Sequence, residues 1–359
     1  MPIARLACRL CNEGAIDAAM KETPPAGGPS VTIVTASDSG YFGLLQDLIF
    51  SLQRGLGERL PPLSILDIGL NEEQRVWLRA LGADIRPLGW DLDYPARSHP
   101  PNSFKVLAGR PHLPKHFPGY DIYLWIDADC WVQDSSVLDL YIRAAAQGKL
   151  AIVAEIDRGY WTIHKRPKFW GQNQRAFSWA FGMREGYRFG RNAILNAGVF
   201  ALRGDAPHWR LWSENYARAL KRFRLSPWAY KGNISFFLSD QTSLNRAVFV
   251  QGAKATFLPA YCNWFCGKGT PMYDASSHQV VEPHEPHRPL GIIHLAGEGM
   301  KERIWKLQTL QGGTIETRLT FGAVNALAAQ NRRKPNARSR SGRGRGTARP
   351  SRSPRRGRS

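Results

Sequence analysis

The feature that most constrains the fold is an alternation of strand-like and helix-like segments in the first half of the chain. Short apolar runs rich in β-branched residues, typical of buried strands, occupy residues 31–35, 63–68, 83–88, 122–126 and 150–154. Segments with apolar residues at helical spacing lie between them, at residues 41–54, 72–81 and 135–146. Strands that alternate with helices favour a mostly parallel sheet, so the sequence predicts an α/β fold.

The caps of the second expected helix can also be read from the sequence. Asn71 precedes two glutamates and is the expected N-cap, and Gly82 is the expected C-cap.

The second half of the chain gives a less regular pattern. A strand is expected over residues 194–202, a helix over 205–221, the start of another helix at 239–245, and a short strand at 292–293. Residues 160–192 are dense in aromatic and basic residues and show no clean period. That composition predicts a loop or a lid.

Composition favours one enzyme-sized globular body. The chain has 359 residues, of which 43% are hydrophobic, and no apolar run approaches the roughly 18 residues of a membrane span. Five prolines and glycines between residues 24 and 29 predict a flexible leader over 1–29, with the folded domain over 30–331. The leader lacks the apolar centre of a signal peptide, and the five cysteines are an odd, scattered set. We therefore expect a soluble cytoplasmic protein.

The net charge is concentrated at the C-terminal end. Of the formal charge of +20, twelve positive charges lie in residues 332–359, which contain no acidic residue, so the remaining chain carries +8. This Ser/Gly/Pro/Arg-rich segment is predicted to be a disordered tail. It could bind RNA or an anionic membrane surface, which would make the protein peripheral at the membrane, or it could only improve solubility.

Two carboxylates follow the apolar run at residues 122–126. Asp127 and Asp129 are separated by Ala128. Mn²⁺ and Mg²⁺ prefer carboxylate oxygen, and ligands of α/β proteins collect at the carboxyl ends of strands. Taken alone, however, Asp-x-Asp is also typical of a polar surface turn.

Four further motifs accompany this pair in a fixed order. Together the five are Thr35-Ala36-Ser37-Asp38-Ser39-Gly40-Tyr41, Asp127-Ala128-Asp129, Asn196-Ala197-Gly198-Val199, Asp240-Gln241, and His294-Leu295-Ala296-Gly297 with Lys301 behind it. The ordered set, over about residues 31–306, resembles the family 8 glycosyltransferases, the retaining group that includes glycogenin and bacterial lipooligosaccharide galactosyltransferases. The resemblance implies a single GT-A domain, a Rossmann-like nucleotide-diphospho-sugar transferase. It also implies Mn²⁺-dependent (or Mg²⁺-dependent) transfer of a hexose from a UDP-sugar to an acceptor hydroxyl.

The resemblance also implies roles for individual residues. The metal ligands would be Asp127, Asp129 and His294. Uracil and ribose would contact Ala36, Asp38 and Tyr41, and the diphosphate would contact Lys301. The donor would also meet Lys105, Ala128, Gly198 and Gly297. The transferred sugar would be surrounded by Asn196, Asp240 and Gln241, the last two being the catalytic candidates. Because a neutral amide is a poor nucleophile, we expect Gln241 to support a front-face mechanism.

The sequence departs from the family pattern at two points. Three residues, where the family has two, separate Gly297 from Lys301, and no proline follows the lysine, so Arg303 or Lys306 could take its place. Gly40 stands where the family often has asparagine. Two predicted residues also have ordinary alternatives, since Lys105 could be a solvated helix lysine and Asp240 a helix cap.

The acceptor is left open by the sequence. A glycan, a lipid-linked saccharide, a protein side chain and a small polyol all remain, with residues 160–192 expected to face the acceptor or to cover the nucleotide. Three other functions are alternatives to sugar transfer. A haloacid-dehalogenase-type phosphohydrolase would want Thr or Val where Trp131 stands. A nucleic-acid-binding protein would act through the basic tail, and a zinc site would use Cys8, Cys11, Cys262 and Cys266.

Overall fold

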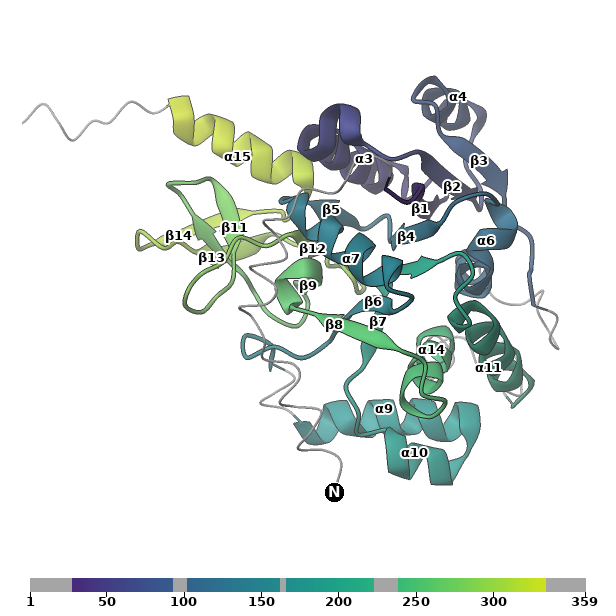
Figure 1. The fold of residues 1–359 in the computed structure, drawn as a ribbon. Coiled ribbons are helices and arrows are strands. Elements are labelled where there is room, and N and C mark those ends of the chain that lie inside the picture. Colours follow the sequence, from purple (N-terminus) through teal and green to yellow (C-terminus); the bar gives the residue numbers. More distant parts are fainter. Residues whose placement is uncertain (1–27, 93–101, 162–165, 223–237, 334–359) are drawn as a thin grey trace, which may run out of the picture.

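The structure is a computed structural model that describes residues 28–92, 102–161, 166–222 and 238–333 (Figure 1). Most of the expected leader and tail lies outside these residues, as do Cys8 and Cys11. The described helix α15 ends at Arg333, close to the predicted end of the folded domain at residue 331.

A seven-stranded sheet forms the centre of the molecule, in the order β3-β2-β1-β4-β7-β6-β8 (Figure 1). Its strands are β1 (Val31–Ser37), β2 (Leu63–Asp67), β3 (Asp84–Pro87), β4 (Ile122–Ile126), β6 (Leu150–Ala154), β7 (Leu195–Arg203) and β8 (Ala255–Leu258). Strand β7 runs antiparallel to its neighbours β4 and β6, whereas the other neighbouring pairs are parallel. The predicted α/β class with a mostly parallel sheet is confirmed.

Helices cover both faces of this sheet. They are α3 (Phe42–Leu56), α4 (Glu72–Ala80), α5 (Ser103–Gly109), α6 (Leu113–His116), α7 (Ser136–Ala146), α9 (Arg166–Phe181), α10 (Met183–Phe189), α11 (His208–Arg222), α14 (Ser239–Phe249) and α15 (Phe321–Arg333). Short 3₁₀ turns lie at η1 (Gly57–Arg59), η2 (Arg110–His112) and η3 (Ala260–Asn263). Asn71 caps α4 in a capping box with Gln74, as predicted. The C-cap is Leu81 and not the predicted Gly82. Gly82 follows it, and its φ of +76° turns the chain out of the helix.

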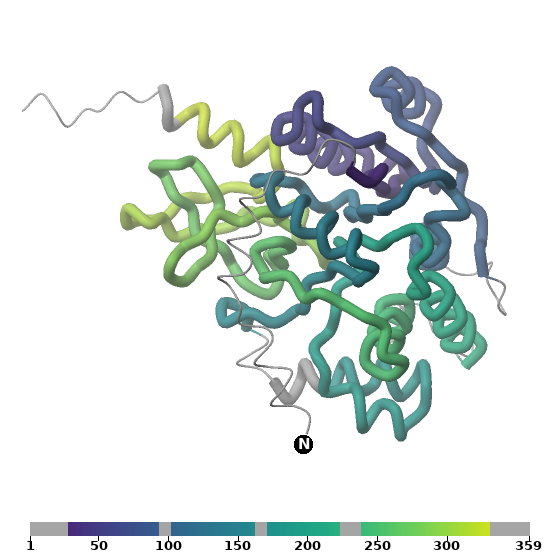
Figure 2. The backbone as a smooth tube through the Cα atoms, in the orientation of Figure 1, coloured from purple at the N-terminus to yellow at the C-terminus, as the bar shows by residue number. Residues whose placement is uncertain are grey.

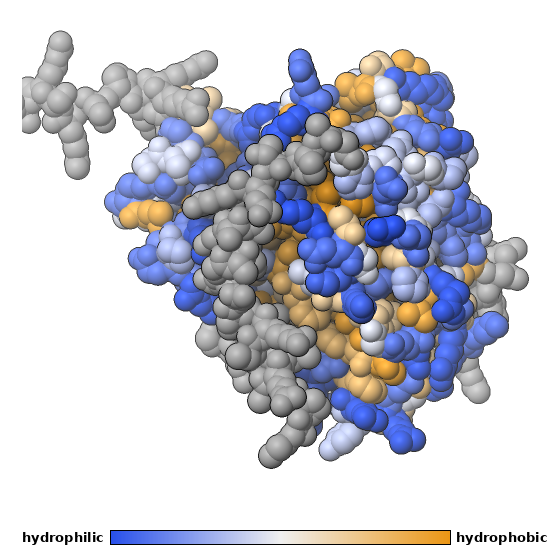
Figure 3. Space-filling view, viewed as in Figure 1, coloured by the Kyte–Doolittle hydropathy of each residue, from blue (hydrophilic) through white to orange (hydrophobic). Residues whose placement is uncertain are grey.

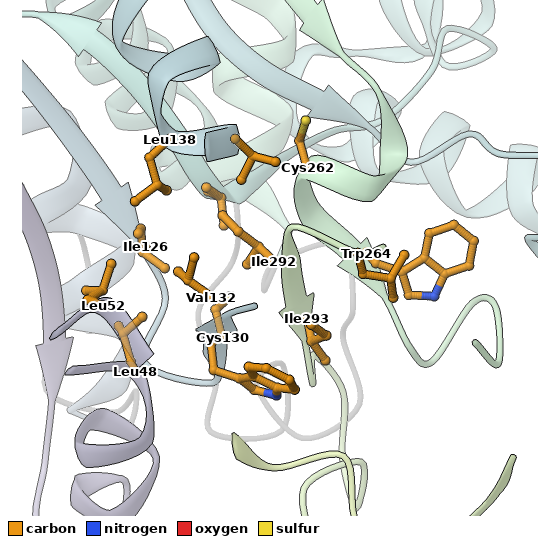
Figure 4. Close-up of a cluster of buried hydrophobic side chains, with 14 of the residues drawn as sticks. Leu48, Leu52, Ile126, Cys130, Val132, Leu138, Cys262, Trp264, Ile292 and Ile293 are labelled. Carbon is orange, nitrogen blue, oxygen red and sulfur yellow. The ribbon is translucent and has the colours of Figure 1, made fainter. Parts of the chain in front are cut away.

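Each face of the sheet has its own hydrophobic core, because alternate residues of a strand point to opposite faces. In β4, Leu124 and Ile126 belong to the core beneath α3 and α7, whereas Tyr123 and Trp125 belong to the core beneath α5, α9, α11 and α14. Figure 4 shows part of the first core, where the side chains of α3 lie beside β4 and β5. A strand buried on both faces explains the unbroken apolar run of β4.

Smaller sheets extend the first core. Strands β5 (Cys130–Val132), β12 (Ile292–His294) and β9 (Trp264–Phe265) form a three-stranded sheet in the order β5-β12-β9. Two hairpin-like pairs are β10 (Met272–Asp274) with β11 (Gln279–Val281), and β13 (Trp305–Gln308) with β14 (Thr314–Thr317). In Figure 2 the green-to-yellow part of the chain, which contains the strands of these sheets other than β5, lies beside the purple-to-blue part that begins the central sheet.

The prediction of a loop or lid over residues 160–192 is wrong for most of that segment. Helices α9 and α10 occupy it, joined at Gly182, whose φ is +104°. The apolar face of α9 consists of Ala176, Phe177, Ala180 and Phe181, which are buried. These positions lie in the second half of the helix, whereas the sequence of the first half mixes basic, aromatic and polar residues, so the segment as a whole has no clean helical period.

The helix expected over 205–221 begins three residues later, at His208. The Asp205 carboxylate is held by the Arg203 guanidinium, and Ala206 N donates to Arg203 O at 3.1 Å. Residues 203–206 therefore form a turn before α11.

The surface in Figure 3 is hydrophilic around its rim, and apolar residues gather towards the middle, around α7 and β8 of Figure 1. Among the helices that the structure describes, none combines the length and the apolar character needed to cross a bilayer.

Candidate functional site

The carboxyl end of β4 positions the Asp127–Asp129 pair. The Asp127 backbone N–H donates to Gly198 O of β7 at 2.8 Å, which ties the turn to the antiparallel neighbour strand. The Trp125 indole N–H donates to Asp127 Oδ1, also at 2.8 Å. The turn is thus part of the sheet and not a loose surface turn.

The small sheet brings His294 to the same point. In the antiparallel register of β12 with β5, His294 lies opposite Cys130, the residue after Asp129. His294 Nε2 is 3.3 Å from Asp129 Oδ1 and 4.0 Å from Asp127 Oδ2. Its Nδ1 lies 3.1 Å from Asn263 Oδ1. Because an amide oxygen only accepts, Nδ1 donates there, and this bond orients the ring with Nε2 towards the two carboxylates.

These side chains fit a divalent cation of the Mn²⁺ or Mg²⁺ type. Ligand atoms of Asp129, Cys130 and His294 lie within 4.8 Å of one another. Carboxylate oxygen with one imidazole nitrogen suits such an ion, and Asn263, which accepts a hydrogen bond from the imidazole, fixes the orientation of the ring. Cys130 belongs to the hydrophobic core, and burial raises the pKa of its thiol well above the ordinary value, so it suits packing better than ligation. Asp127 stands slightly farther from the group, because Arg110 and Trp125 hold its Oδ1.

Arg110 connects two of the predicted motifs. Its Nη2 lies 2.6 Å from Asp127 Oδ1, and its Nη1 lies 2.9 Å from Asp240 Oδ2. The guanidinium also stands 5.2 Å from the ring centroid of Trp125. Burial raises the pKa of Asp240 to about 6 and raises that of Asp127, while Arg110 opposes both shifts. Asp240 is in the first turn of α14 but does not cap it, since the N-cap is Leu238.

Asn196 and Gln241 are held by the backbone of β7. The Asn196 carbonyl oxygen accepts from Gly198 N at 2.7 Å, and Gln241 Oε1 accepts from Ala197 N at 3.1 Å. The Asn196 amide donates to Glu155 Oε1 at 2.8 Å, and Glu155 in turn pairs with Lys268. Both predicted amides are therefore fixed in orientation before any ligand binds.

Lys268 is a half-buried lysine in this network. Burial lowers the pKa of its ammonium to about 7, while the adjacent Glu155 carboxylate favours the charged form. The side chain is 22% exposed and reaches the same hollow as Asn196.

On the other side of the metal candidates, Lys301 lies over the ring of Tyr41, with Nζ 3.6 Å from the centroid. Its ammonium also contacts the Tyr41 hydroxyl and stands 3.5 Å from Asp129 Oδ2. Tyr41 itself is anchored through its backbone N–H, which donates to Asp38 Oδ1 at 2.9 Å. Of the three basic candidates in this segment, Lys301 is the one that lines the cavity, since Arg303 stacks on Trp305 and Lys306 is exposed on β13.

A cavity of about 840 Å³ joins these groups. It is lined by ten of the predicted residues, namely Tyr41, Asp127, Asp129, Asn196, Gly198, Asp240, Gln241, His294, Gly297 and Lys301. Four predicted donor residues are not among its lining residues: Ala36, Asp38, Ala128 and Lys105. Ala36 and Ala128 are buried, and Asp38 and Lys105 are half-buried.

Several lining or supporting residues were not predicted from the sequence. They are Arg110, Glu155, Asn263 and Lys268. Only Arg110 left a signal, since an arginine that directly follows the apolar stretch 106–109 suggests burial with a carboxylate partner. The other three residues belong to the site only through contacts with residues distant in the sequence, which leave no local pattern.

Gly198 provides space at the centre of the site. A Cβ atom at this position would lie 2.5 Å from His294 Cε1 and 2.8 Å from both Asn196 Oδ1 and Asp127 Oδ2. Only glycine lets these three side chains approach one another so closely.

The chain matches no protein-family model, and no curated protein matches it by sequence. Among solved structures it is similar to the galactosyltransferase LgtC in complex with donor and acceptor sugar analogues, with 18% identity and a TM-score of 0.46 over 74% of this chain and 87% of that one. It is also similar to the bifunctional glycosyltransferase WbbM, with 15% identity and a TM-score of 0.47 over 77% of this chain and 47% of that one. A third similar structure is mouse xyloside xylosyltransferase 1, with 13% identity and a TM-score of 0.46 over 76% of this chain and 98% of that one.

These similar proteins are glycosyltransferases, the class that the sequence motifs resemble. Their TM-scores lie below 0.5, so the proposal that follows rests on the residues of the cavity.

Proposed function

We propose that this protein is a glycosyltransferase that moves a hexose from a UDP-sugar to an acceptor hydroxyl, with retention of configuration and with Mn²⁺ or Mg²⁺ as cofactor. One observation carries the proposal. Motifs that lie as far as 260 residues apart in the sequence, from Tyr41 to Lys301, meet around a single cavity that combines a metal-ligand pair, cations and sugar-binding amides.

The chemistry of each side chain in the cavity indicates its role in binding the donor and the metal. Asp129 and His294, with Asp127 beside them, would hold the divalent ion, which when bound stabilises the negative charge of the departing diphosphate. Lys301 would add a point charge for the same diphosphate. Tyr41 has an exposed ring, 44% accessible, that would stack on the uracil base.

The sugar end of the donor would lie among Asn196, Asp240 and Gln241. Asn196 and Gln241 are already fixed by β7, so little side-chain freedom would be lost on binding. Gln241 is too poor a nucleophile for a covalent intermediate, which favours a front-face route in which Gln241 positions the sugar or stabilises positive charge on it. Asp240, held as a carboxylate by Arg110, could accept a hydrogen bond from a sugar hydroxyl.

The acceptor would enter beside α9. Trp161, 41% exposed, and Gln172 line the cavity on this side, and an indole ring is a suitable face for a sugar. Trp161 is held in place through its indole N–H, which donates to Gly267 O at 2.8 Å.

The proposal is tested by the melting temperature of the full chain with UDP-glucose or UDP-galactose, each with and without Mn²⁺. A ligand that binds only the folded state raises the melting temperature, and we expect this rise to require both the nucleotide sugar and Mn²⁺. Asp129→Asn should abolish it and should slow UDP-sugar hydrolysis by about a hundredfold or more.

The matched control is Asp84→Asn, which removes an exposed carboxylate of β3 that pairs with Arg86. It should leave both the melting shift and hydrolysis unchanged. Full hydrolysis by Asp129→Asn in the presence of EDTA would contradict the proposal.

A further inference from the structure

The outer side of the α9–α10 helix pair has an unusual composition. Between residues 171 and 191, every exposed side chain is either arginine or a large apolar or aromatic residue. These are Arg175, Trp179, Met183, Arg184, Tyr187, Arg188 and Arg191, and we call them the basic–aromatic face. Trp179, Met183 and Tyr187 are 54%, 75% and 68% exposed. In Figure 1, α9 and α10 lie together at one end of the molecule, away from α15.

The fold holds this face rigidly. The opposite side of α9 is buried against the core shared with α11 and α14. Helix α10 packs so closely on α9 that a Cβ atom at Gly186 would meet Ser178 Oγ at 1.9 Å, and one at Gly190 would meet Gln174 Cα at 2.4 Å. Because the helix pair is packed this closely, the fold itself holds the large apolar side chains of the face in their outward positions.

The positive charge of the face is not balanced within residues 171–191. Glu185 is the one acidic residue in residues 171–191, and both of its carboxylate oxygens are taken by Arg246, at 2.8 and 2.9 Å. On the edge of the face, Arg222 of α11 donates to Trp179 O at 3.3 Å, which brings a further basic group alongside.

We propose that the basic–aromatic face docks on the surface of an anionic lipid bilayer. Trp and Tyr side chains are enriched at the level of lipid headgroups, and a methionine that is three-quarters exposed gains by leaving water for the acyl boundary. Arginines beside them gain from the negative surface potential. A second copy of the chain suits the face less well, because it would set four arginines against four others.

The basic–aromatic face lies outside the residues assigned to the donor, so its docking on a bilayer does not depend on sugar transfer. Docking would nevertheless place the cavity close to the bilayer, because Gln172 of the same helix lines it.

The test is flotation of the full chain with vesicles of phosphatidylglycerol and phosphatidylcholine, compared with vesicles of phosphatidylcholine alone. The basic tail is present in every variant, so its contribution to vesicle binding is the same in all of them. Raising the salt from about 0.15 M to about 0.5 M shortens the screening length and weakens binding that is purely electrostatic. Met183→Ser/Tyr187→Ser removes the two most exposed apolar side chains of the face, and Arg184→Glu/Arg188→Glu reverses two of its charges. Each should lower the affinity for anionic vesicles about tenfold or more.

The matched control is Arg59→Glu/Arg318→Glu, which makes the same change of net charge at two exposed arginines outside the face. It should lower the affinity by no more than about threefold, as expected for distant charges. Unchanged melting temperatures would show that all three variants are folded. Equal losses in the face and control variants would overturn the proposal, as would unchanged vesicle binding by the Met183/Tyr187 variant. Loss of binding to an RNA oligonucleotide with vesicle binding retained would also overturn it, in favour of a nucleic-acid surface.

Discussion

Replacing Arg110 with alanine should have a large and specific cost, because this buried side chain sits between two carboxylates, that of the buried Asp240 and that of the half-buried Asp127. Arg110 is 8% exposed, and it lies 2.6 Å from Asp127 and 2.9 Å from Asp240. Arg110→Ala leaves both acids in a low-dielectric environment without a counter-charge. Removing one partner of a buried ion pair typically costs about 3–5 kcal/mol, much of it as the penalty for the remaining charge.

The expected loss in the free energy of unfolding at pH 7 is therefore about 3–5 kcal/mol, measured by urea denaturation of the full chain. The matched control is Arg79→Ala. Arg79 Nη1 lies 2.7 Å from Glu72 Oε1, a comparable distance, but both side chains are more than half exposed. A pair of that kind contributes at most about 1 kcal/mol.

The loss should also depend on pH in a defined direction. Without Arg110, the pKa values of Asp127 and Asp240 should rise further, since the cation that opposes the effect of burial is gone. Arg110→Ala should then lose less stability at pH 5 than at pH 7, because protonated carboxyls need no counter-charge. For the same reason, adding Asp240→Asn to Arg110→Ala should recover part of the loss, which a double-mutant cycle measures. A loss below about 1 kcal/mol, equal to that of Arg79→Ala and independent of pH, would refute this account.

Two further predictions concern the centre of the site. Gly198→Ala should lower UDP-sugar hydrolysis and cost about 1–3 kcal/mol of stability, because its Cβ would lie 2.5 Å from His294 Cε1. Gly43→Ala, at a helical position where a Cβ meets nothing within 4 Å, should be neutral or stabilising, and equal effects of the two changes would be inconsistent with the crowding argument. The folded-state pKa of Asp240, about 6, lies above its ordinary value of 3.8, so its share of the stability is present below pH 4 and is lost as the pH rises through 6. Urea denaturation from pH 4 to 7 should show a steeper decline for the wild type than for Asp240→Asn, and parallel curves would contradict the assignment.

The parts of the fold that could be predicted from the sequence are those whose pattern is local. Strands β4 and β6 begin and end where their apolar runs do, because both are buried on both faces of the sheet. The two-residue strand β9 and the three-residue strand β5 were missed, since segments so short become strands only through pairing with β12. Helix α9 was missed for a different reason. The sequence of its first half mixes basic, aromatic and polar residues without a period, which obscures the buried stripe of its second half.

The candidate site likewise contains residues that could be predicted from the sequence and residues that could not. Asp127, Asp129 and His294 could be predicted because they occur in short motifs whose residue types suit a metal. Arg110 and Lys268 could not be placed, since an isolated basic residue reveals its role only when its carboxylate partner is known. Asp127 lies 17 residues from Arg110, and Glu155 lies 113 residues from Lys268.

The charges that line the cavity explain why metal and donor should bind together. In the structure four of these carboxylates lie beside a cation: Asp127 and Asp240 beside Arg110, Asp129 beside Lys301, and Glu155 beside Lys268. A divalent ion beside Asp129 would compete with Lys301 for that carboxylate. The ion alone would add positive charge next to a displaced ammonium, and a diphosphate alone would add negative charge next to two aspartates, so each is unfavourable without the other. Bound together, the two nearly cancel and leave Lys301 facing the diphosphate. We therefore expect Mn²⁺ to bind weakly to the free protein and tightly in the presence of UDP.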